Sequence, residues 1–553
     1  MTSRALPESS VVDFTYKGRW WRNRGIIMLN ICLLIPLMTS AVNGLDSSLI
    51  NGLQILPGWQ RYFDHPSGKL LGFINSAQFI GNLCGLPIAP FVSDIFGRRA
   101  GLFLGSLIMF AGVGLQAGSA NVATLIGARI IIGFGLCFCS NAAPLLLIEL
   151  SYPTQRGKIT SMYNTNWYLG SIISAWVCYG SYIHTKESMW SWRVPTLVQA
   201  FLPLVQVASV WFIPESPRWL ISRGLEEKAC KVLAKYHANG GNEHDPLVVF
   251  EIAQIRHALK MEAEINRRTS YWSLFSTPGN RKRMMIIMAI AIFSQWSGNG
   301  LVSYYINIVL DGVGITSTAA KVLINGNLQI FNFLVALSAS MLVDWAGRRT
   351  LFIVSNSGML ISFSAWTIST ALYNTAHTSA AAIATIPLIF IFYFFYDIAY
   401  TPLVVAYTLE ILPYRVRAKG FAVMNITLML TVAFNQFVNP WALASIGWQY
   451  YIVYCAWLIV ELAFVAIFIV ETKGRTLEET AALFDGENHR QNLVALGRES
   501  AAIELSRVMV LPKLKTRSQR RGVQDEYGEN LKIRDLYSEW RRASPAGDDK
   551  MAV

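Results

Sequence analysis

The stretch Asp94-Ile-Phe-Gly97-Arg98-Arg99 indicates how the chain is organised, because its pattern returns as Asp344-Trp-Ala-Gly347-Arg348-Arg349. Each copy lies between two long apolar runs. A second pair of motifs follows in the same order: Glu149 precedes Arg156 by seven positions, and Glu410 precedes Arg417 by seven. Two such repeats indicate two related halves. Repeated sets of hydrophobic segments are typical of membrane transporters.

The composition is that of a membrane protein. Of the 553 residues, 53% are hydrophobic and 15% are charged, whereas a soluble domain has about 25% charged residues. The seven cysteines lie mostly inside apolar runs without paired spacing, which argues against a disulfide framework and against a metal site. The net charge of +13 comes from basic residues scattered through loops and tails, so it indicates positive cytoplasmic loops rather than nucleic-acid binding.

About twelve apolar runs are near the length that crosses roughly 30 Å of hydrocarbon. The predicted spans are 26–48, 72–92, 101–118, 122–146, 160–183, 195–213, 284–310, 322–343, 350–372, 383–408, 421–443 and 448–470. The sequence therefore predicts an all-α membrane protein with two six-helix bundles.

The polar segments divide the chain into five parts, and Lys and Arg place both ends and the middle in the cytoplasm. These parts are an N-terminal tail (1–25), a first bundle (26–213), a middle loop with short helices (214–283), a second bundle (284–470) and a C-terminal tail (471–553). The first apolar run begins near Ile26 and is long enough to stay in the bilayer, so no cleavable signal peptide is expected.

Several further motifs follow the spans at regular places. They are Arg129-Ile-Ile-Ile-Gly133, Pro214-Glu215-Ser-Pro-Arg218-Trp-Leu220, Glu410-Ile-Leu-Pro-Tyr-Arg-Val-Arg417-Ala-Lys-Gly420 and Glu471-Thr-Lys-Gly-Arg-Thr-Leu-Glu-Glu479. With the two Asp-x-x-Gly-Arg-Arg loops, this ordered set resembles the sugar-porter branch of the major facilitator superfamily. The resemblance implies the twelve-helix facilitator fold and secondary transport of a sugar.

Within that branch, Gln295-Trp-Ser-Gly-Asn299-Gly-Leu-Val-Ser-Tyr304-Tyr305 is similar to fungal lactose and cellodextrin permeases. Hexose carriers have a Gln-Gln pair at this place, and Ser294 replaces its first Gln here; they usually have a Gln where this chain has Asn164. Val404 and Val405 replace their usual Pro-Trp. By this resemblance we expect a glycoside larger than glucose.

Asp46 and Arg129 are ionisable residues of apolar runs, which in membranes usually face a cavity and pair with each other. We expect Asp46 to take up a proton and lose its hold on Arg129, which would couple protons to substrate. In related sugar porters an Asp at this place accompanies proton symport. The alternative interpretation is that Asp46 merely ends its helix at the outer interface.

A sugar site needs amides for hydroxyl groups and aromatic faces for C–H surfaces. Gln295 and Asn299 are four residues apart, so a continuous helix would place them on one face. The predicted substrate residues are Gln295, Asn299, Tyr304, Tyr305, Asn164, Asn435, Trp167 and Trp441. Alternatively, the amides only join neighbouring helices by hydrogen bonds.

The repeated acids and bases of the loops predict a cytoplasmic gate. Its members are Asp94, Arg98, Glu149, Arg156, Glu215 and Arg218 in the first half, and Asp344, Arg348, Glu410 and Arg417 in the second. A network formed in one state and broken in the other would bias alternating access. A purely topological role explains the Arg residues but not the repeated acids.

The sequence thus predicts a monomeric, proton-coupled importer of a di- or oligosaccharide in a fungal-type cell membrane. Its partners are the sugar, protons and lipid; we expect no enzyme activity, cofactor, metal or nucleic acid. No G-x-x-x-x-G-K-[ST] loop supports transport driven by ATP. The alternatives are a hexose transporter, a transporter of a secondary metabolite with the same fold, and a sugar sensor that signals through its tail.

Overall fold

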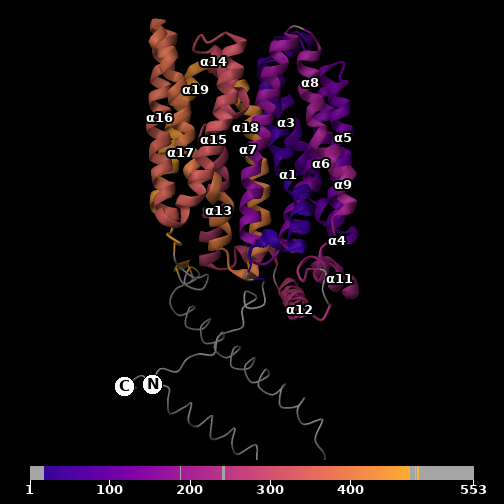
Figure 1. Ribbon diagram of the computed structural model, residues 1–553. Helices are drawn as coiled ribbons and strands as arrows, with labels where there is room; N and C mark the ends of the chain where they lie inside the picture. The colour runs from indigo at the N-terminus through magenta and orange to yellow at the C-terminus, as the bar shows by residue number, and fades with distance from the viewer. Residues whose placement is uncertain are drawn as a thin grey trace, which may run out of the picture. The chain divides into compact units, whose positions relative to one another are not determined.

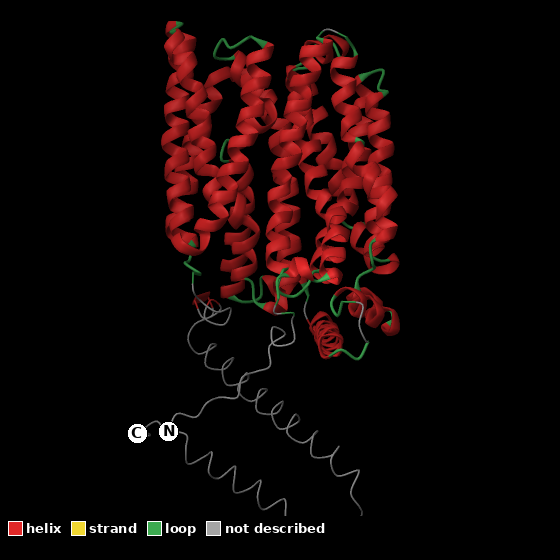
Figure 2. Cartoon of the chain, in the orientation of Figure 1, coloured by secondary structure: helices red, strands yellow, loops and turns green. Residues whose placement is uncertain are grey.

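The computed structural model describes residues 16, 18–186, 188–239, 243–268, 270–473, 480 and 483–484, and within these ranges it is helical with no strand. At Asn164 and Asp344 it describes the backbone but not the side chain. The predicted N-terminal tail and C-terminal tail lie mostly outside the described residues. Figure 2 shows long helices in red, joined by short green loops.

The first half of the chain contains the helices α1 to α9, which form its membrane spans. Its helices are α1 (Arg24–Ile55), α2 (Pro57–Tyr62), α3 (Gly68–Gly85), α4 (Ala89–Phe96), α5 (Arg98–Ala117), α6 (Val122–Leu150), α7 (Arg156–Thr185), α8 (Trp190–Gln199) and α9 (Phe201–Ser209). A single turn, η2 (Trp20–Arg22), precedes α1, and another, η3 (Val210–Phe212), follows α9. The α3–α4 pair bends by 47° at its break and is together long and apolar enough to cross a membrane.

The second half repeats this arrangement after a short middle segment. The middle helices are α10 (Pro217–Ser222), α11 (Glu226–Tyr236), α12 (Pro246–Arg268) and η4 (Tyr271–Leu274). The second half has α13 (Pro278–Trp296), α14 (Asn299–Asp311), α15 (Thr318–Ala346), α16 (Arg348–Ala376), α17 (Ser379–Ile411), α18 (Tyr414–Ile446), η5 (Gly447–Gln449) and α19 (Tyr450–Phe468).

Length and apolarity alone identify nine spanning segments among the described residues, or ten with the bent pair. One of these segments, Val416–Phe468, holds both α18 and α19. The remaining predicted span is α7, which is long enough to cross but carries many polar residues, including Asn164, Asn166 and four serines. A transporter can bury such residues between helices, where lipid does not reach them.

The two halves pack through equivalent helices. The second span of each half contacts the fifth of the other, as α3 with α18 and as α15 with α7. The first spans, α1 and α14, also meet. Figure 1 shows the indigo-to-magenta half beside the pink-to-orange half, with α11 and α12 at one end of the spans. We call the end with α10–α12 the inner face and the opposite end the outer face.

Among the described residues, the halves share a hydrophobic core only near the outer face. Leu49, Leu53 and Trp59 from the outer end of α1 and from α2 join one cluster with residues of α13–α19. The inner part of the first half, which includes Ile26 of α1 and Leu150 of α6, packs in a separate cluster without residues of the second half. The described conformation is therefore closed between the halves at the outer face.

The middle segment docks on the first half by a buried histidine. The imidazole Nδ1 of His237, just after α11, lies 2.7 Å from a carboxylate oxygen of Glu251 on α12. Its Nε2 lies 3.2 Å from the carbonyl oxygen of Leu150 at the inner end of α6. The imidazole therefore joins α12 to the inner end of α6.

Glycines bring the helices of the first half into close contact. A Cβ on Gly133 of α6 would lie 1.8 Å from the carbonyl oxygen of Gln78, and one on Gly81 of α3 would lie 2.0 Å from that of Ile130. The α1–α7 pair repeats this arrangement, since a Cβ on Gly44 would lie 1.8 Å from the carbonyl oxygen of Trp167. Small residues let membrane helices approach this closely.

We expect Gly133→Ala to destabilise the protein by about 1–3 kcal/mol, the usual cost of overpacking, because its methyl group would force α3 and α6 apart. Gly127→Ala on the same helix is the control, since a Cβ there meets no atom within 4 Å. The measurement is the thermal melting of the purified protein in detergent. Equal melting temperatures of the two variants would contradict the proposed close packing.

Candidate substrate and proton sites

Asp46 lies within α1 and is fully buried, with 0% of its surface exposed. Its carboxylate accepts hydrogen bonds from the side-chain amides of Gln78 on α3 and Gln199 on α8. Arg129 on α6 is also buried, and it donates to Oε1 of Gln78 at 2.8 Å and to the carbonyl oxygen of Ile74 at 3.0 Å. Gln78 therefore bridges the acid and the base.

This arrangement changes two expectations. Among the described ion pairs none joins Asp46 directly to Arg129, so the predicted interaction between them is indirect and runs through Gln78. The reason is that an amide has both a donor and an acceptor and can lie between an anion and a cation. Asp46 also does not end its helix, as the interfacial interpretation required, because α1 continues to Ile55.

The predicted pair Gln295 and Asn299 lies on either side of a helix break. Helix α13 ends at Trp296 and α14 begins at Asn299, with Gly298 between them at φ +102°. Glycine adopts this left-handed conformation readily. The expectation that one continuous helix places both amides on one face is wrong, because the helix does not continue through Gly298.

The break leaves backbone carbonyl groups that side chains of other helices bind. The hydroxyl of Tyr396 on α17 donates to the carbonyl oxygen of Ser294 at 2.7 Å. The amide of Asn435 on α18 donates to that of Gln295 at 2.6 Å. Asn299 is buried, and its Oδ1 has no hydrogen-bond partner among the described residues. Broken helices of this kind mark binding sites in many transporters.

A cluster of buried polar residues joins the halves beside this break. The amide of Asn51 on α1 donates to Asn325 of α15 at 3.4 Å, and that of Gln54 donates to the carbonyl oxygen of Tyr304 at 3.3 Å. Tyr305 donates to Oε1 of Gln436 on α18 at 3.1 Å. Four amide atoms of the cluster have no partner among the described residues: Oε1 of Gln54, Nδ2 of Asn75, Nδ2 of Asn325 and Nε2 of Gln436. Each unsatisfied buried group costs about 1–3 kcal/mol, so these atoms favour a polar ligand or water.

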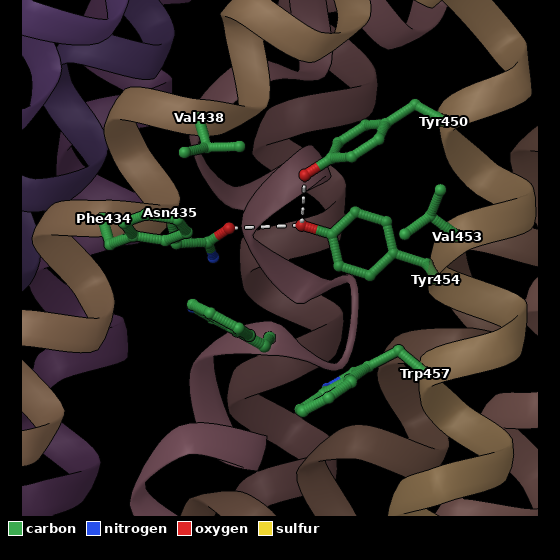
Figure 3. A pocket seen from close by; sticks show the side chains of 8 residues that line it. Phe434, Asn435, Val438, Tyr450, Val453, Tyr454 and Trp457 are labelled. Carbon is green, nitrogen blue, oxygen red and sulfur yellow. Dashed lines mark hydrogen bonds between the residues drawn. The ribbon is translucent and has the colours of Figure 1, made fainter.

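Asn435 lines a small pocket between α13, α18 and α19. Figure 3 shows its amide oxygen facing the hydroxyl of Tyr454, at 3.2 Å, with Tyr450 and Trp457 nearby. The pocket has a volume of about 150 Å³, whereas small-molecule sites have roughly 300–1,000 Å³. Neither Gln295 nor Asn299 lines it. The pocket is therefore too small to hold a disaccharide.

The remaining predicted substrate residues are not brought together with this group. Trp441 is 44% exposed and lies under the ammonium of Lys69, which is 5.2 Å from its ring centre. Trp167 packs edge-on against Tyr168, with ring centres 5.1 Å apart. The side chain of Asn164 lies outside the described residues.

Four of the predicted gate residues form one cluster at the inner face of the first half. Nε of Arg98 lies 3.1 Å from Glu149, and its Nη1 lies 3.1 Å from Asp94. The carboxylate of Glu215 accepts hydrogen bonds from the backbone N–H groups of Arg98 and Arg99, at 3.1 and 3.2 Å. It therefore caps the N-terminus of α5, where an anion is favourable.

The second half has an equivalent cluster. Arg348 pairs with Glu410 at 2.8 Å. The carboxylate of Glu471 accepts from the backbone N–H groups of Arg348 and Arg349, at 2.9 and 3.0 Å, and so caps α16. Ser216 and Thr472 complete the likeness, since each hydroxyl lies 2.5 Å from the motif glutamate of its own half.

Gly97 and Gly347 fit these caps, with φ of +103° and +87°. A Cβ at Gly97 would lie 2.4 Å from the carboxylate of Glu215, and one at Gly347 would lie 2.8 Å from that of Glu471.

Other predicted gate residues lie outside these two clusters. Arg218 pairs with Glu262 on α12, and Arg156 is exposed at the start of α7. Arg417 donates to the carbonyl oxygen of Leu412 at 3.2 Å. The side chain of Asp344 lies outside the described residues. Among those described, no ion pair joins the two clusters, so the predicted gate residues form two separate units in this conformation.

Sequence reasoning missed several residues that these contacts show. They are Gln78, Gln199, Asn51, Gln54, Gln436, Glu471 and Asp397. Glu471 follows the last span as Glu215 follows the sixth, so its place in the repeat was a usable signal. Asp397 is an acid inside an apolar run, the same signal that identified Asp46.

Comparison with known proteins supports the fold. The family model described as "Sugar (and other) transporter" matches residues 32–484. The quinate permease of Emericella nidulans is 27% identical over 476 residues, which cover 81% of this chain and 86% of that protein. The high-affinity glucose transporter of Kluyveromyces lactis is 26% identical over 487 residues, which cover 84% of this chain and 87% of that protein.

A solved structure shows the same fold. It is the partially occluded inward open conformation of the xylose transporter XylE from E. coli, with a TM-score of 0.67 and 23% identity. The match covers 81% of this chain and 100% of that chain. The predicted all-α facilitator fold and the multi-pass membrane protein are thereby confirmed.

The two caps differ in their pKa values. Burial raises the pKa of Glu215 above its ordinary value, although the backbone N–H groups of Ser216, Arg99 and Arg98 lower it. At Glu471 burial also raises the pKa, but the N–H groups of Lys473, Arg348 and Arg349 together outweigh it, and the pKa lies below its ordinary value. The charged form is therefore favoured at Glu471 and disfavoured at Glu215.

We expect Glu471→Gln to destabilise the protein at pH 7 more than Glu215→Gln, by about 1.5–3 kcal/mol, the usual contribution of hydrogen bonds to a charged group. A depressed pKa contributes stability above the unfolded pKa and loses it as the pH falls, whereas a raised pKa does the reverse. Acidification should therefore narrow the difference between the melting temperatures of the two variants. A difference that widens in acid would show that the assigned directions are wrong.

Proposed function

The chain belongs to the family of sugar and other transporters, and on this premise we propose that it carries a polyhydroxylated substrate together with protons by alternating access. The main support is the group of unsatisfied amide atoms contributed by both halves at their interface, on Gln54, Asn75, Asn325 and Gln436. A substrate with several hydroxyl groups supplies both the donors and the acceptors that these atoms need.

We propose that the substrate is a di- or oligosaccharide of the lactose or cellobiose kind. The support is the sequence around the helix break, with Ser294, Gln295 and Asn299, and its similarity to fungal lactose and cellodextrin permeases. In this proposal Gln295 and Asn299 contact the sugar. The helix break interrupts the backbone hydrogen bonds of the helix, so polar groups beside it are available to a ligand. Tyr304 and Tyr305 follow these two residues on α14, and Tyr304 connects to the first half through Gln54.

A hexose or another small polyol is a second candidate. The resemblance to a glucose transporter favours a hexose, and that to a quinate permease favours a non-sugar ring with several hydroxyl groups. The same amides would bind each of these substrates, so the size and charge of a substrate would decide whether the protein carries it.

In the proposed cycle, Asp46 binds a proton and Gln78 transmits the change to Arg129. A protonated Asp46 accepts weaker hydrogen bonds, since bonds to a charged acceptor are roughly twice as strong as neutral ones. Gln78 is then free to reorient between α1, α3 and α6.

The capped motifs at the inner face join spans within each half and do not join the halves to each other in this conformation. Each unit fixes the start of one span, α5 or α16, to the end of the last span of its own half. We propose that each bundle moves as a rigid body because of these contacts. We also propose that the protein is a monomer in the cell membrane, with both termini in the cytoplasm.

We expect a yeast strain without its own sugar transporters to accumulate radiolabelled cellobiose or lactose when it expresses the protein, because the proposed site fits a disaccharide. A protonophore should abolish the accumulation. Glucose, xylose and quinate belong in the same panel. Uptake of quinate alone would show that the substrate is not a sugar, and uptake that ignores the protonophore would contradict symport.

We expect Asp46→Asn to lower accumulation against a gradient at least about tenfold, because one coupled proton contributes about tenfold for each unit of pH gradient. Exchange of labelled for unlabelled sugar should persist, since it needs no net proton movement. Ser48→Ala is a control on the same helix. Accumulation that survives in Asp46→Asn would exclude the proton role.

A further inference from the structure

A second acid, Asp397, lies in the interior near the middle of α17 and is fully buried. Its Oδ1 accepts hydrogen bonds from the hydroxyl of Tyr168, at 2.6 Å, and from that of Thr401, at 2.7 Å. Tyr168 belongs to α7 of the other half. The carboxyl group therefore makes a hydrogen bond across the interface of the two halves.

The other oxygen of Asp397 has no partner. Oδ2 is buried and makes no hydrogen bond to any described residue. Within the same part of the chain, no Lys, Arg or His forms an ion pair with Asp397. Asp46, in contrast, accepts two amide hydrogen bonds and lies near Arg129. A permanently ionised carboxyl group with an unsatisfied oxygen and no cation would be costly in a membrane interior, whereas a proton on Oδ2 removes the charge.

The surroundings of Asp397 connect it to the helix break. The titratable groups that interact with it are the tyrosines Tyr168 of α7 and Tyr393 and Tyr396 of its own helix. Tyr393 donates to the carbonyl oxygen of Asn299 at 2.7 Å, and Tyr396 donates to that of Ser294. The next acid, Glu461 of α19, interacts with Tyr396 rather than with Asp397.

The bond between Tyr168 and Asp397 also has a distinctive position. Apart from the 3.3 Å contact of the Tyr168 hydroxyl with that of Thr401, the other described hydrogen bonds between the halves join the outer part of α1, at Asn51 and Gln54, to α14 and α15. Tyr168 and Asp397 lie deeper, about midway along α7 and α17. Their bond thus lies where the closed outer region gives way to the inner part, in which the first half packs by itself.

We propose that Asp397 is a second proton-binding site of the transport cycle, separate from Asp46. This proposal rests on the proposed function as a proton-coupled transporter. A proton from the aqueous phase bonds to a lone pair of Oδ2 and turns the carboxylate into a neutral acid, and no other covalent bond changes. The neutral acid accepts a weaker hydrogen bond from Tyr168. Protonation therefore weakens the hydrogen bond between the halves. A substrate bound at the adjacent helix break would also act on α17, because Tyr393 and Tyr396 of that helix bind carbonyl groups of the break.

Infrared difference spectroscopy of the purified protein in lipid nanodiscs tests the site without any substrate. Between neutral and acidic buffer, we expect the carbonyl stretch of a buried protonated carboxyl group to appear in the wild type. The band should be lost in Asp397→Asn and kept in Asp46→Asn. If all carboxyl bands persist in Asp397→Asn, the proposal is wrong.

Tyr168→Phe keeps the carboxyl group and serves where Asp397→Asn does not fold. Because Phe cannot donate to Oδ1, the carbonyl stretch assigned to Asp397 should shift in frequency. Tyr163→Phe on the same helix is the matched control and should leave the band unchanged. A band that Tyr168→Phe does not move would contradict the assignment to Asp397.

Transport measures the coupling separately. In proteoliposomes with a pH gradient of one unit, we expect Asp397→Asn to lower the limiting accumulation of radiolabelled cellobiose about tenfold, which is the contribution of one proton. Its exchange of labelled for unlabelled cellobiose should persist. Unchanged accumulation would exclude a coupled proton at Asp397. An intact infrared band in a wild type that ignores protonophores would support the proton site while refuting the proposed symport.

Discussion

The hydrocarbon of the bilayer offers no water to polar groups, so every buried polar group must find its partner within the protein. This constraint explains why Gln78 lies between Asp46 and Arg129 and why Tyr396 and Asn435 bind the carbonyl groups that the break at Gly298 leaves free. The same constraint makes the exceptions informative, namely the buried polar atoms without a hydrogen-bond partner among the described residues. The unsatisfied amides at the interface and Oδ2 of Asp397 are places where a substrate, water or a proton completes what the described chain does not supply.

The inner face shows how one solution serves two halves. In each half a glutamate that follows the last span caps the helix after the Asp-x-x-Gly-Arg-Arg turn, and the turn needs glycine both for its φ and for the space of the carboxylate. The arginine of the same turn pairs with a second glutamate. These contacts tie three spans of a bundle together at one end. They are made within the halves, so a movement of one half against the other leaves them intact.

The spans and the duplication could be predicted from the sequence because both follow from composition and spacing. The predicted substrate pair, Gln295 and Asn299, was proposed from a motif. The break between them was not predicted, since glycines are common in membrane helices and Gly298 alone does not indicate a break. Gln78 and Gln199 could not be assigned because their roles depend on which helix faces meet Asp46. Asp397 was within reach of the rule that identified Asp46, but the partner from the opposite half depends on packing that no local pattern encodes.

The shared outer core determines from which side a drug-like molecule can act. With Leu49, Leu53 and Trp59 packed into the second half, a compound that approaches from the outer face meets this shared hydrophobic core before the polar cluster in this conformation. A blocker designed for this conformation must therefore approach from the inner face. Molecules selected to act from the outer face need the opposite conformation as their template.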